Sequence, residues 1–200
     1  SVEGACTTGT LTGSGYEARL PVTCSFNEVP VNTYVVATTV DGGYYAGYNE
    51  DVLTVYDPSL GFATGGGWFY WPGTTDKTNF GFTMKYNKKA TNVQGSLLLI
   101  RHTDDDEIYR IKSNALDGLA VGVGDGFGWA SFSGKTTYLE PGMDEPEGNH
   151  EFITYVEDRN EPGTGTDRFW IEVHDKDGAV IWDLSMDRDA VDNTVHILGG

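Results

Sequence analysis

The sequence predicts an all-β protein, and two observations lead to that fold class. Glycine accounts for 27 of the 200 residues and aromatic residues for 12%, a balance typical of many short strands joined by tight turns. Apolar residues alternate with polar ones in one segment after another, whereas a helical period is absent except at Ser113–Ala120. We therefore expect two β-sandwich-like domains: a small immunoglobulin-like domain and a larger antiparallel sandwich or jelly-roll-like domain.

Residues 1–58 are expected to form the immunoglobulin-like domain. Strands are predicted at 18–26, 34–40 and 52–56, which are rich in β-branched and aromatic residues and are separated by turn residues. About four strands are fewer than a complete immunoglobulin-type sandwich contains, so this domain is either partial or packed on its neighbour. At Asp57–Gly61 glycine and aromatic clusters replace the threonine and valine runs, which places the domain boundary after Pro58.

Residues 59–200 are expected to form the larger domain. Its clearest strand is Thr78–Tyr86, where large apolar side chains alternate onto one face as far as Tyr86. A hairpin turn is predicted at Asp175–Gly178, between 169–171 and 180–182, because Gly178 suits a left-handed conformation. Ser113–Ala120 has the spacing of one short helix. Further strands are predicted at 96–102, 107–113, 128–132, 150–157 and 168–174.

The charge of the chain excludes some classes of partner. With 13 basic against 30 acidic residues, the net charge of -17 repels phosphate backbones and anionic lipid headgroups, so we expect no nucleic-acid partner. No apolar window approaches the length that spans a bilayer, so we expect no membrane insertion. The N-terminus lacks the basic and apolar regions of a signal peptide, which is compatible with a processed or an excised chain.

The only cysteines are Cys6 and Cys24. They have neither CxxC spacing nor a nearby histidine for a zinc site, so a disulfide is the simplest interpretation. A disulfide places the protein in an oxidising compartment, and we expect it to be secreted, extracellular or at the cell surface. Two unpaired buried thiols are the alternative.

A series of motifs resembles the post-COAP modules of secreted bacterial repeat proteins. The motifs cover about the last two thirds of the chain, and Val29–Tyr34 and Tyr44–Gly47 look like the end of the immunoglobulin-like repeat that leads into such a module. The resemblance implies an exported, multi-domain, β-rich surface protein of bacterial type, without known catalytic residues. The motifs are Val55–Trp68, Asn79–Phe82, Lys85–Lys89, Val93–Gly95, Ile108–Ser113 and Glu157–Ile171.

One departure from the resemblance concerns the end of the sequence. Similar modules run on from the terminal glycines into a short apolar strand, whereas this sequence stops at Leu198–Gly200. We therefore expect an unpaired sheet edge, to which a neighbouring copy of the chain adds a strand.

Two acidic segments are candidate calcium sites, because clustered carboxylates are the oxygen ligands that calcium prefers. For the first, the alternative is a solvated hairpin tip; for the second, it is an Asx-turn loop between paired strands. If a metal binds, we expect calcium at the second segment. The first segment contains Asp104 and Asp106, and the second contains Asp158, Asn160, Glu161 and Asp167.

The aromatic run after Gly65–Gly67 is a candidate carbohydrate site formed by Trp68, Tyr70 and Trp71. Exposed aromatic faces flanked by polar residues stack on sugar rings in β-sandwich lectins. The alternative, which we favour, is that Trp68 and Phe69 straddle a strand with one face in the core.

The sequence contains no recognisable set of catalytic residues. Its four histidines lack metal-site or nucleophile spacing, and no carboxylate pair stands out among so many acidic residues. We therefore expect a non-enzymatic structural or adhesive module of a secreted bacterial surface or extracellular assembly. Its expected partners are copies of itself or adjacent surface-protein domains, met through β-strand edges. The alternative is a carbohydrate-binding β-sandwich module.

Overall fold

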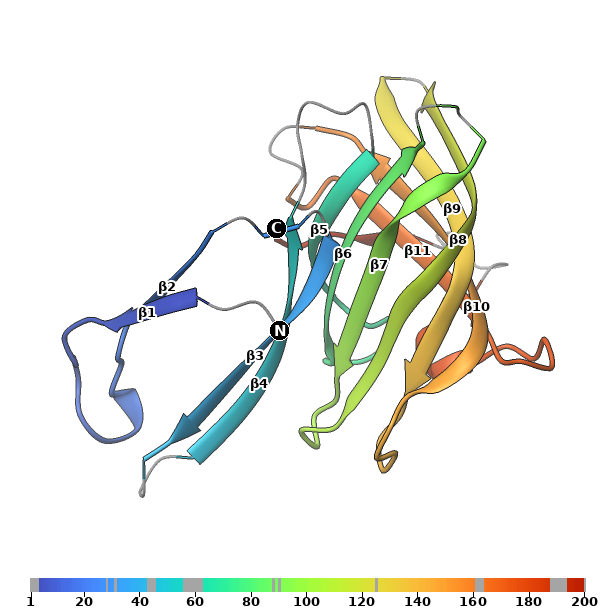
Figure 1. Cartoon of the computed structure of the whole chain (residues 1–200). Coiled ribbons are helices and arrows are strands. Elements are labelled where there is room, and N and C mark those ends of the chain that lie inside the picture. Colours follow the sequence, from blue (N-terminus) through green and yellow to red (C-terminus); the bar gives the residue numbers. More distant parts are fainter. Residues whose placement is uncertain are drawn as a thin grey trace. The chain divides into compact units, whose positions relative to one another are not determined.

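The predicted all-β class is confirmed by the computed structural model of the chain (Figure 1). In the described part, the regular structure consists of strands and two 3-10 turns. None of the described residues forms a helix with the length and apolar character that a membrane span needs. The structure describes residues 4–27, 29–30, 32–42, 46–55, 63–87, 89, 91–124, 126–160, 164–187 and 194–199.

The chain divides into two compact units, Ser1–Pro30 and Val31–Gly200. This division differs from the expected one after Pro58, and residues 57–61, on which the expectation rested, lie outside the described residues. The second unit begins earlier because the hairpin of β3 (Asn32–Asp41) and β4 (Ala46–Val55) contacts the strands that follow.

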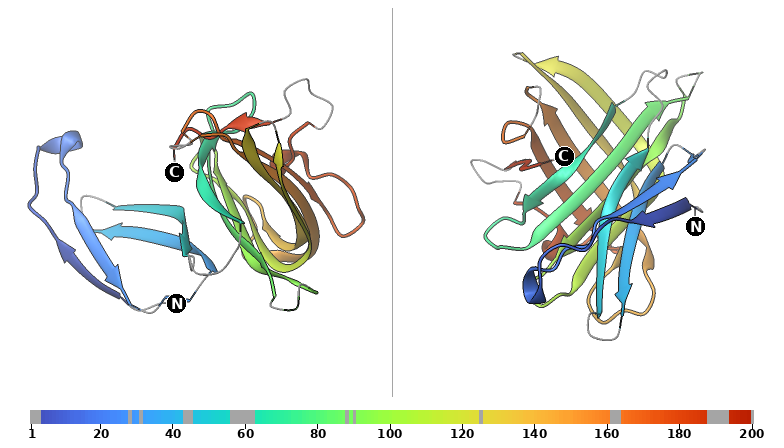
Figure 2. Two further views of the ribbon diagram at one scale, coloured as in Figure 1. Left: turned by 90° about the horizontal axis from the view of Figure 1, so that it is seen from above. Right: turned by 90° about the vertical axis from the view of Figure 1, so that its left-hand side faces the viewer.

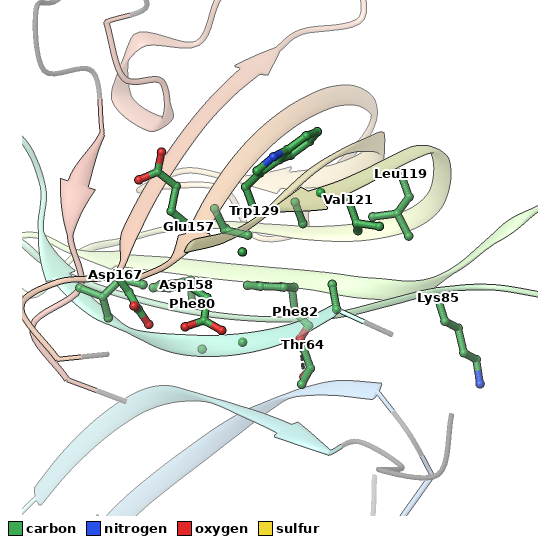
Figure 3. A pocket seen from close by; sticks show the side chains of 18 of the residues that line it. Thr64, Phe80, Phe82, Lys85, Leu119, Val121, Trp129, Glu157, Asp158 and Asp167 are labelled. Carbon is green, nitrogen blue, oxygen red and sulfur yellow. Dashed lines mark hydrogen bonds between the residues drawn. The ribbon is translucent and has the colours of Figure 1, made fainter. Parts of the chain in front are cut away.

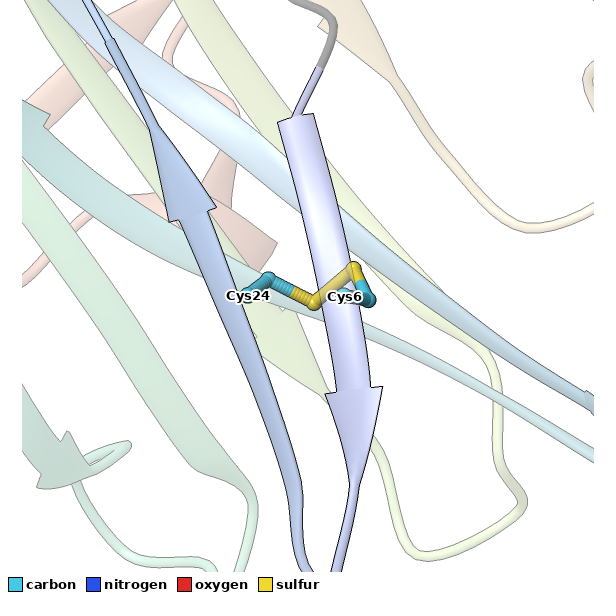
Figure 4. Close-up of a disulfide and its surroundings, with 2 residues drawn as sticks. All are labelled: Cys6 and Cys24. Carbon is cyan, nitrogen blue, oxygen red and sulfur yellow. A yellow bond between two sulfur atoms is a disulfide. The ribbon is translucent and has the colours of Figure 1, made fainter.

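The first unit is a two-stranded ribbon. Strands β1 (Gly4–Thr8) and β2 (Val22–Phe26) are antiparallel, and a 3-10 turn, η1 (Gly15–Glu17), lies between them. Cys6 and Cys24 are directly opposite each other and form the predicted disulfide (Figure 4). Every described residue of both strands is exposed, so the ribbon buries no core of its own. An isolated two-stranded ribbon is marginally stable at best. The disulfide between β1 and β2 therefore holds the two strands together.

The second unit is built on one curled antiparallel sheet of eight strands, in which each strand pairs with its neighbours in the sequence (Figures 1 and 2). Seen from above in Figure 2, the strands wrap around a common interior. The larger domain is therefore antiparallel, as expected. The strands are β5 (Ala63–Tyr70), β6 (Lys77–Tyr86), β7 (Val93–His102), β8 (Ile108–Gly124), β9 (Phe127–Leu139), β10 (Glu147–Asp158), β11 (Arg168–His174) and β12 (Val195–His196).

Alternate side chains of these strands point inward and form the core. Phe69, Phe80 and Phe169 meet at its centre, with ring centroids 4.3 to 5.9 Å apart. Phe69 and Phe80 come from the neighbouring strands β5 and β6, whereas Phe169 comes from β11, near the other end of the sheet order, so its contact with them requires the sheet to curl. Burying each such ring contributes about 1.5–3 kcal/mol of stability.

The C-terminal segment closes the curled sheet. On one side β12 pairs with β11, at Arg168 and Phe169. On the other side the Trp68 N–H donates to Gly199 O, and the Leu198 N–H donates to Trp68 O, each at 2.8 Å. A Cβ at position 67 would lie 2.5 Å from Gly199 O, so the close approach of the two backbones needs glycine there.

One end of the curled sheet is filled. Arg101 points inward from β7, and its Nε donates to Asp76 Oδ2 at 2.8 Å in a buried ion pair. The guanidinium lies 5.0 Å from the Trp71 ring centroid and 5.5 Å from that of Tyr109. Leu184, at the end of the 3-10 turn η2 (Trp182–Leu184), is fully buried in the same core. This end is the closed end of the sheet.

The β3–β4 hairpin packs on the outer face of β6 and β7. Leu98 and Ile100 point to this outer face and are fully buried, although strand alternation places them opposite the inner core. Ser96, on the same face, accepts hydrogen bonds at 2.9 Å from the backbone and hydroxyl of Thr33. Glu50 of β4 forms an ion pair with Arg110 of β8 at 2.7 Å. The hairpin thus covers a second apolar surface of the sheet.

The predicted helix at Ser113–Ala120 is wrong, because these residues belong to β8. The register of β8 against β9 shifts twice, between Ser113 and Ala115 and between Leu116 and Gly118. Each bulge adds one residue to the two-residue alternation of the strand. Inward-facing residues are therefore three positions apart at each bulge, a spacing that resembles the period of a helix.

Of the other local predictions for the larger domain, the turn is confirmed, whereas the strand after it and the end of the Thr78–Tyr86 strand differ from the prediction. The turn at Asp175–Gly178 is confirmed, with Gly178 at φ 83° and its N–H donating to Asp175 O at 3.1 Å. Beyond that turn only Val180 pairs, with His174, and residues 182–184 form η2 instead of a strand. Tyr86 is 45% exposed and lies outside the buried row that precedes it in β6.

Replacing Asp76 by Ala should destabilise the second unit by about 3–5 kcal/mol, because the charge of Arg101 would stay buried without its partner. Urea unfolding of D76A measures the loss, and the double variant D76A/R101M should recover much of it. D105A, at an exposed aspartate, should change the free energy of unfolding by no more than about 0.5 kcal/mol. A D76A variant as stable as D105A would contradict the role of this ion pair.

Reducing the Cys6–Cys24 disulfide should loosen the ribbon without affecting the curled sheet. The bridge joins residues 18 apart, and closing such a loop contributes about 3 kcal/mol by constraining the unfolded chain. Hydrogen exchange should speed up across residues 4–26 and stay unchanged in β6 and β7. Faster exchange in β6 on reduction would argue against two separate units.

Candidate functional site

The second unit contains a pocket of about 630 Å³ at the end of the curled sheet opposite Arg101. It exists because β8 pairs with β7 only from Ile108 to Lys112 and afterwards pairs with β9 alone. Just past that point, the Leu97 N–H of β7 donates to Ser113 Oγ of β8 at 2.8 Å. We call this end the open end of the sheet.

The inner wall of the pocket is apolar (Figure 3). Phe80 and Phe82 of β6 form one side and are almost fully buried. Leu119 and Val121 of β8 lie opposite them, and Val121 is 58% exposed at the rim. A volume of this size with an apolar lining and a few polar groups is typical of ligand sites in proteins. Ala63, Ala130, Val156 and Ile197 complete the apolar lining.

Two carboxylates stand at the mouth of the pocket. Asp158 follows the inward-facing Val156 on β10, and Asp167 precedes the inward-facing Phe169 of β11. In Figure 3 both lie on the side of Phe80, whereas Glu157 and Trp129 point away from it. Asp167 Oδ1 accepts the Arg159 N–H at 2.9 Å. The mouth therefore carries negative charge.

Trp129 and Glu157 belong to the outer surface of the sheet, although their strands border the pocket. The Trp129 ring stacks against Tyr155 with centroids 6.2 Å apart, and it packs on Gly122, where a Cβ would lie 2.6 Å from the ring. Glu157 accepts a hydrogen bond from the Tyr155 hydroxyl at 2.9 Å and forms an ion pair with Arg159. These contacts hold the rim of the pocket in place.

Beside the pocket, β5 has an unpaired backbone edge. The N–H and C=O of Trp68 both bond to the C-terminal segment, and in an antiparallel sheet every second residue directs these groups to the same side. The ladder between β5 and β6 has no register shift, so Thr64 and Gly66 present their N–H and C=O groups on that side too. Among the described residues these groups have no hydrogen-bond partner.

The space at this edge is open on both faces of β5. A second hollow of about 410 Å³ lies on the outer face, and Thr64, Gly65 and Gly66 line both it and the first pocket. The residues of β5 that face inward are small in this half of the strand, namely Ala63, Gly65 and Gly67. Glycine within a strand often marks a position where another backbone approaches closely. The Gly65–Gly67 run was thus the signal in the sequence for a free edge.

The proposed calcium ligands are not brought together as a metal site by the described residues. No group of three or more His, Cys, Asp or Glu side chains in that part of the chain is close enough to hold a metal ion. Asp104 accepts hydrogen bonds from the Thr75 hydroxyl at 2.8 and 2.9 Å, and Asp106 has φ 60° in the turn after it. Glu161 lies outside the described residues, and Asn160 is exposed near Asp158. Calcium binding stays a prediction.

The proposed carbohydrate platform is divided between two faces of β5. Trp71 is 5% exposed and packs on Arg101 in the core, so its place in an exposed platform is wrong. Strand alternation turns Phe69 and Trp71 inward, and Trp68 and Tyr70 outward. Trp68 and Tyr70 make an edge-to-face contact at 5.6 Å, and Lys77 Nζ lies 5.3 Å from the Trp68 ring centroid. Only these two residues of the three stand on the outer face.

The histidines lie apart from the pocket. His174 contacts Glu172 at 2.8 Å and the Gly178 carbonyl at 3.1 Å, so both of its ring nitrogens are engaged in holding the hairpin turn. His102 is half-buried on β7, and burial lowers its pKa, although the negative charge of Asp51 opposes the shift. Burial also raises the pKa of Tyr138, whose hydroxyl donates to Glu140 at 2.9 Å. None of these groups is among the pocket-lining residues described.

The comparisons with known proteins find no match for this chain. No family model matches the sequence, and neither a curated protein nor a solved structure matches it. The resemblance to post-COAP modules therefore stays a prediction.

Acidification should weaken the packing around His102. Because its pKa in the folded state lies below the ordinary value of 6.5, the unfolded chain binds the proton more readily, and stability falls as the pH drops through 6.5. The urea midpoint should therefore fall less in H102N than in the wild type between pH 7.5 and pH 5.5. H196N, at an exposed histidine, serves as the control. Equal losses in H102N and the wild type would rule out this contribution.

Proposed function

We propose that this chain is a non-catalytic structural or adhesive module of a secreted surface protein, which holds another polypeptide at the open end of its curled sheet. The observation that carries the proposal is the unpaired edge of Thr64 and Gly66 beside an apolar pocket of about 630 Å³. The disulfide is compatible with the oxidising environment outside the cell.

A polypeptide fits this site better than a compact small molecule does. The apolar pocket alone would suit a small apolar ligand, but such a ligand leaves the N–H and C=O groups of Thr64 and Gly66 unpaired. An extended chain satisfies these groups and can also place alternate side chains in the pocket. The pocket and the edge are adjacent because both border the same half of β5.

The chemistry of the pocket lining supports binding more than catalysis. Its described residues include no histidine, cysteine or serine that would act as a nucleophile or as a base beside one. The lining also includes Lys85 and Glu157, and Glu157 forms an ion pair with Arg159. The charge of the two carboxylates at the mouth, Asp158 and Asp167, is suited to attracting a cationic group of the partner.

A second candidate function, carbohydrate binding, is favoured by one specific observation. Tyr70 is 51% exposed beside Trp68 on the outer face of β5, so two aromatic rings are available to a sugar. Titration of polysaccharides should then change the tryptophan fluorescence of the wild type but not of Y70A. A flat response across diverse glycans would remove this candidate.

Introducing a charge at the rim of the pocket should weaken association. Val121→Glu would place an unpaired carboxylate in the covered site, and we expect the Kd for association to rise by about tenfold or more. Val123→Glu is the matched control, because Val123 is 87% exposed on the same strand and does not line the pocket. Sedimentation velocity over a concentration series measures both variants. A Val121→Glu variant that associates as tightly as the wild type would contradict the proposed binding site.

A further inference from the structure

We infer that the polypeptide held at the open end is a second copy of this chain, which adds its strand β2 to the free edge of β5. This inference rests on the proposed function and identifies both the partner and the element that docks. It starts from two incomplete parts of the molecule: a sheet edge without a strand, and a ribbon without a core.

The ribbon has a free edge that matches the edge of β5. Cys6 and Cys24 are opposite each other with their Cα atoms 4.0 Å apart, the close spacing of a pair that exchanges no backbone hydrogen bonds. The N–H and C=O groups of Cys24 therefore point away from β1, and so do those of Val22 and Phe26, two residues to either side. Among the described residues these groups have no hydrogen-bond partner. The free edges of β2 and β5 can therefore form the ladder that each lacks.

The side chains of β2 match the pocket as well. Val22 and Phe26 share one face of the strand and are 56% and 44% exposed, and the preceding Leu20 is 50% exposed. Large exposed apolar side chains in a row of this kind are costly in water and indicate a contact surface. If β2 lies along Ala63–Gly67, the side chains on one of its faces enter the pocket beside Phe80 and Phe82.

The ribbon is a better electrostatic match for the acidic mouth of the pocket than the rest of this acidic chain is. The whole chain carries a net charge of -17, yet between Gly4 and Asn27 the only charged residues are Glu17 and Arg19, which cancel. The ribbon can therefore approach Asp158 and Asp167 without the repulsion that two acidic surfaces would experience. Arg19, just before β2, is the cation nearest to this strand in the sequence. Salt should strengthen association by screening the remaining repulsion between copies.

The strand that is added, β2, and the edge that receives it, on β5, are different parts of the chain, so the contact between two copies is head-to-tail. Each copy presents β2 to one neighbour and β5 to another, and such contacts propagate into rings or open filaments instead of stopping at a symmetric dimer. In other β proteins, too, an exposed sheet edge pairs with a strand from another chain.

Two edge-blocking variants test the inference in the full-length chain. V22P and G66P each remove one N–H that points to a free edge, leaving the ladders to β1 and β6 without a lost donor. In 0.5 M NaCl, the wild type should form assemblies larger than dimers by sedimentation velocity. Each variant alone should associate at least about tenfold more weakly, whereas an equal mixture of the two should form heterodimers and stop there.

The possible outcomes separate the two proposals. If G66P associates more weakly than the wild type but V22P does not, or if their mixture gives no heterodimer, the inference about β2 is overturned while the proposed function stands. If G66P also associates as well as the wild type, the edge of β5 is not the binding site and the proposed function fails as well. If the wild type remains monomeric, the second-copy assignment is overturned, whereas the proposed function, which names no particular polypeptide, is not. A monomer in which the Val22 and Phe26 amides are protected from hydrogen exchange would also overturn the second-copy assignment. Should either proline variant fail to fold, F26P and T64P remove an N–H from the same two edges.

Discussion

The structure depends on one constraint: a single sheet with an apolar face has to cover that face with itself. Phe69, Phe80 and Phe169 come from strands near opposite ends of the strand order, and their contact exists only when the sheet curls. The two hydrogen bonds between Trp68 and the C-terminal segment complete the curl, and Gly67 permits the close approach they need. Where the sheet closes completely, its end is filled. Where the closure is incomplete, the pocket and the free edge of β5 lie.

The two ends of the curled sheet show how the same architecture yields both stability and a binding site. At the closed end, the ion pair of Arg101 and Asp76 is enclosed by aromatic rings, so a charged group fills space without exposing the core. At the open end, β8 departs from β7, and the inner residues of β5 shrink to alanine and glycine. The pocket and the backbone edge of Thr64 and Gly66, which has no partner among the described residues, lie at the same place. A partner strand would fill the pocket and pair with the edge, which links the packing of the fold to the function we propose.

Much of the fold could be predicted from local pattern, and the errors have physical reasons. The strand at Thr78–Tyr86 and the turn at Gly178 were predictable because alternation and backbone conformation are local properties. The helix at Ser113–Ala120 was predicted wrongly because two bulges in β8 imitate helical spacing. Trp71 was placed in an exposed platform because a run of aromatic residues does not show which face is inward; its contact with Arg101, 30 positions along the chain, decides that.

By itself the sequence determined the all-β class, the antiparallel strands of the larger domain and the pairing of the only two cysteines. These follow from composition, from a two-residue period and from the absence of any other cysteine partner. Only the tertiary structure decided that β3 and β4 join the larger unit and that Asp158 and Asp167 stand at the mouth of one pocket. It also decided that Thr64 and Gly66 keep a free edge. The reason is that the path of a curling sheet depends on register, bulges and closure, which arise from contacts between residues far apart in the chain.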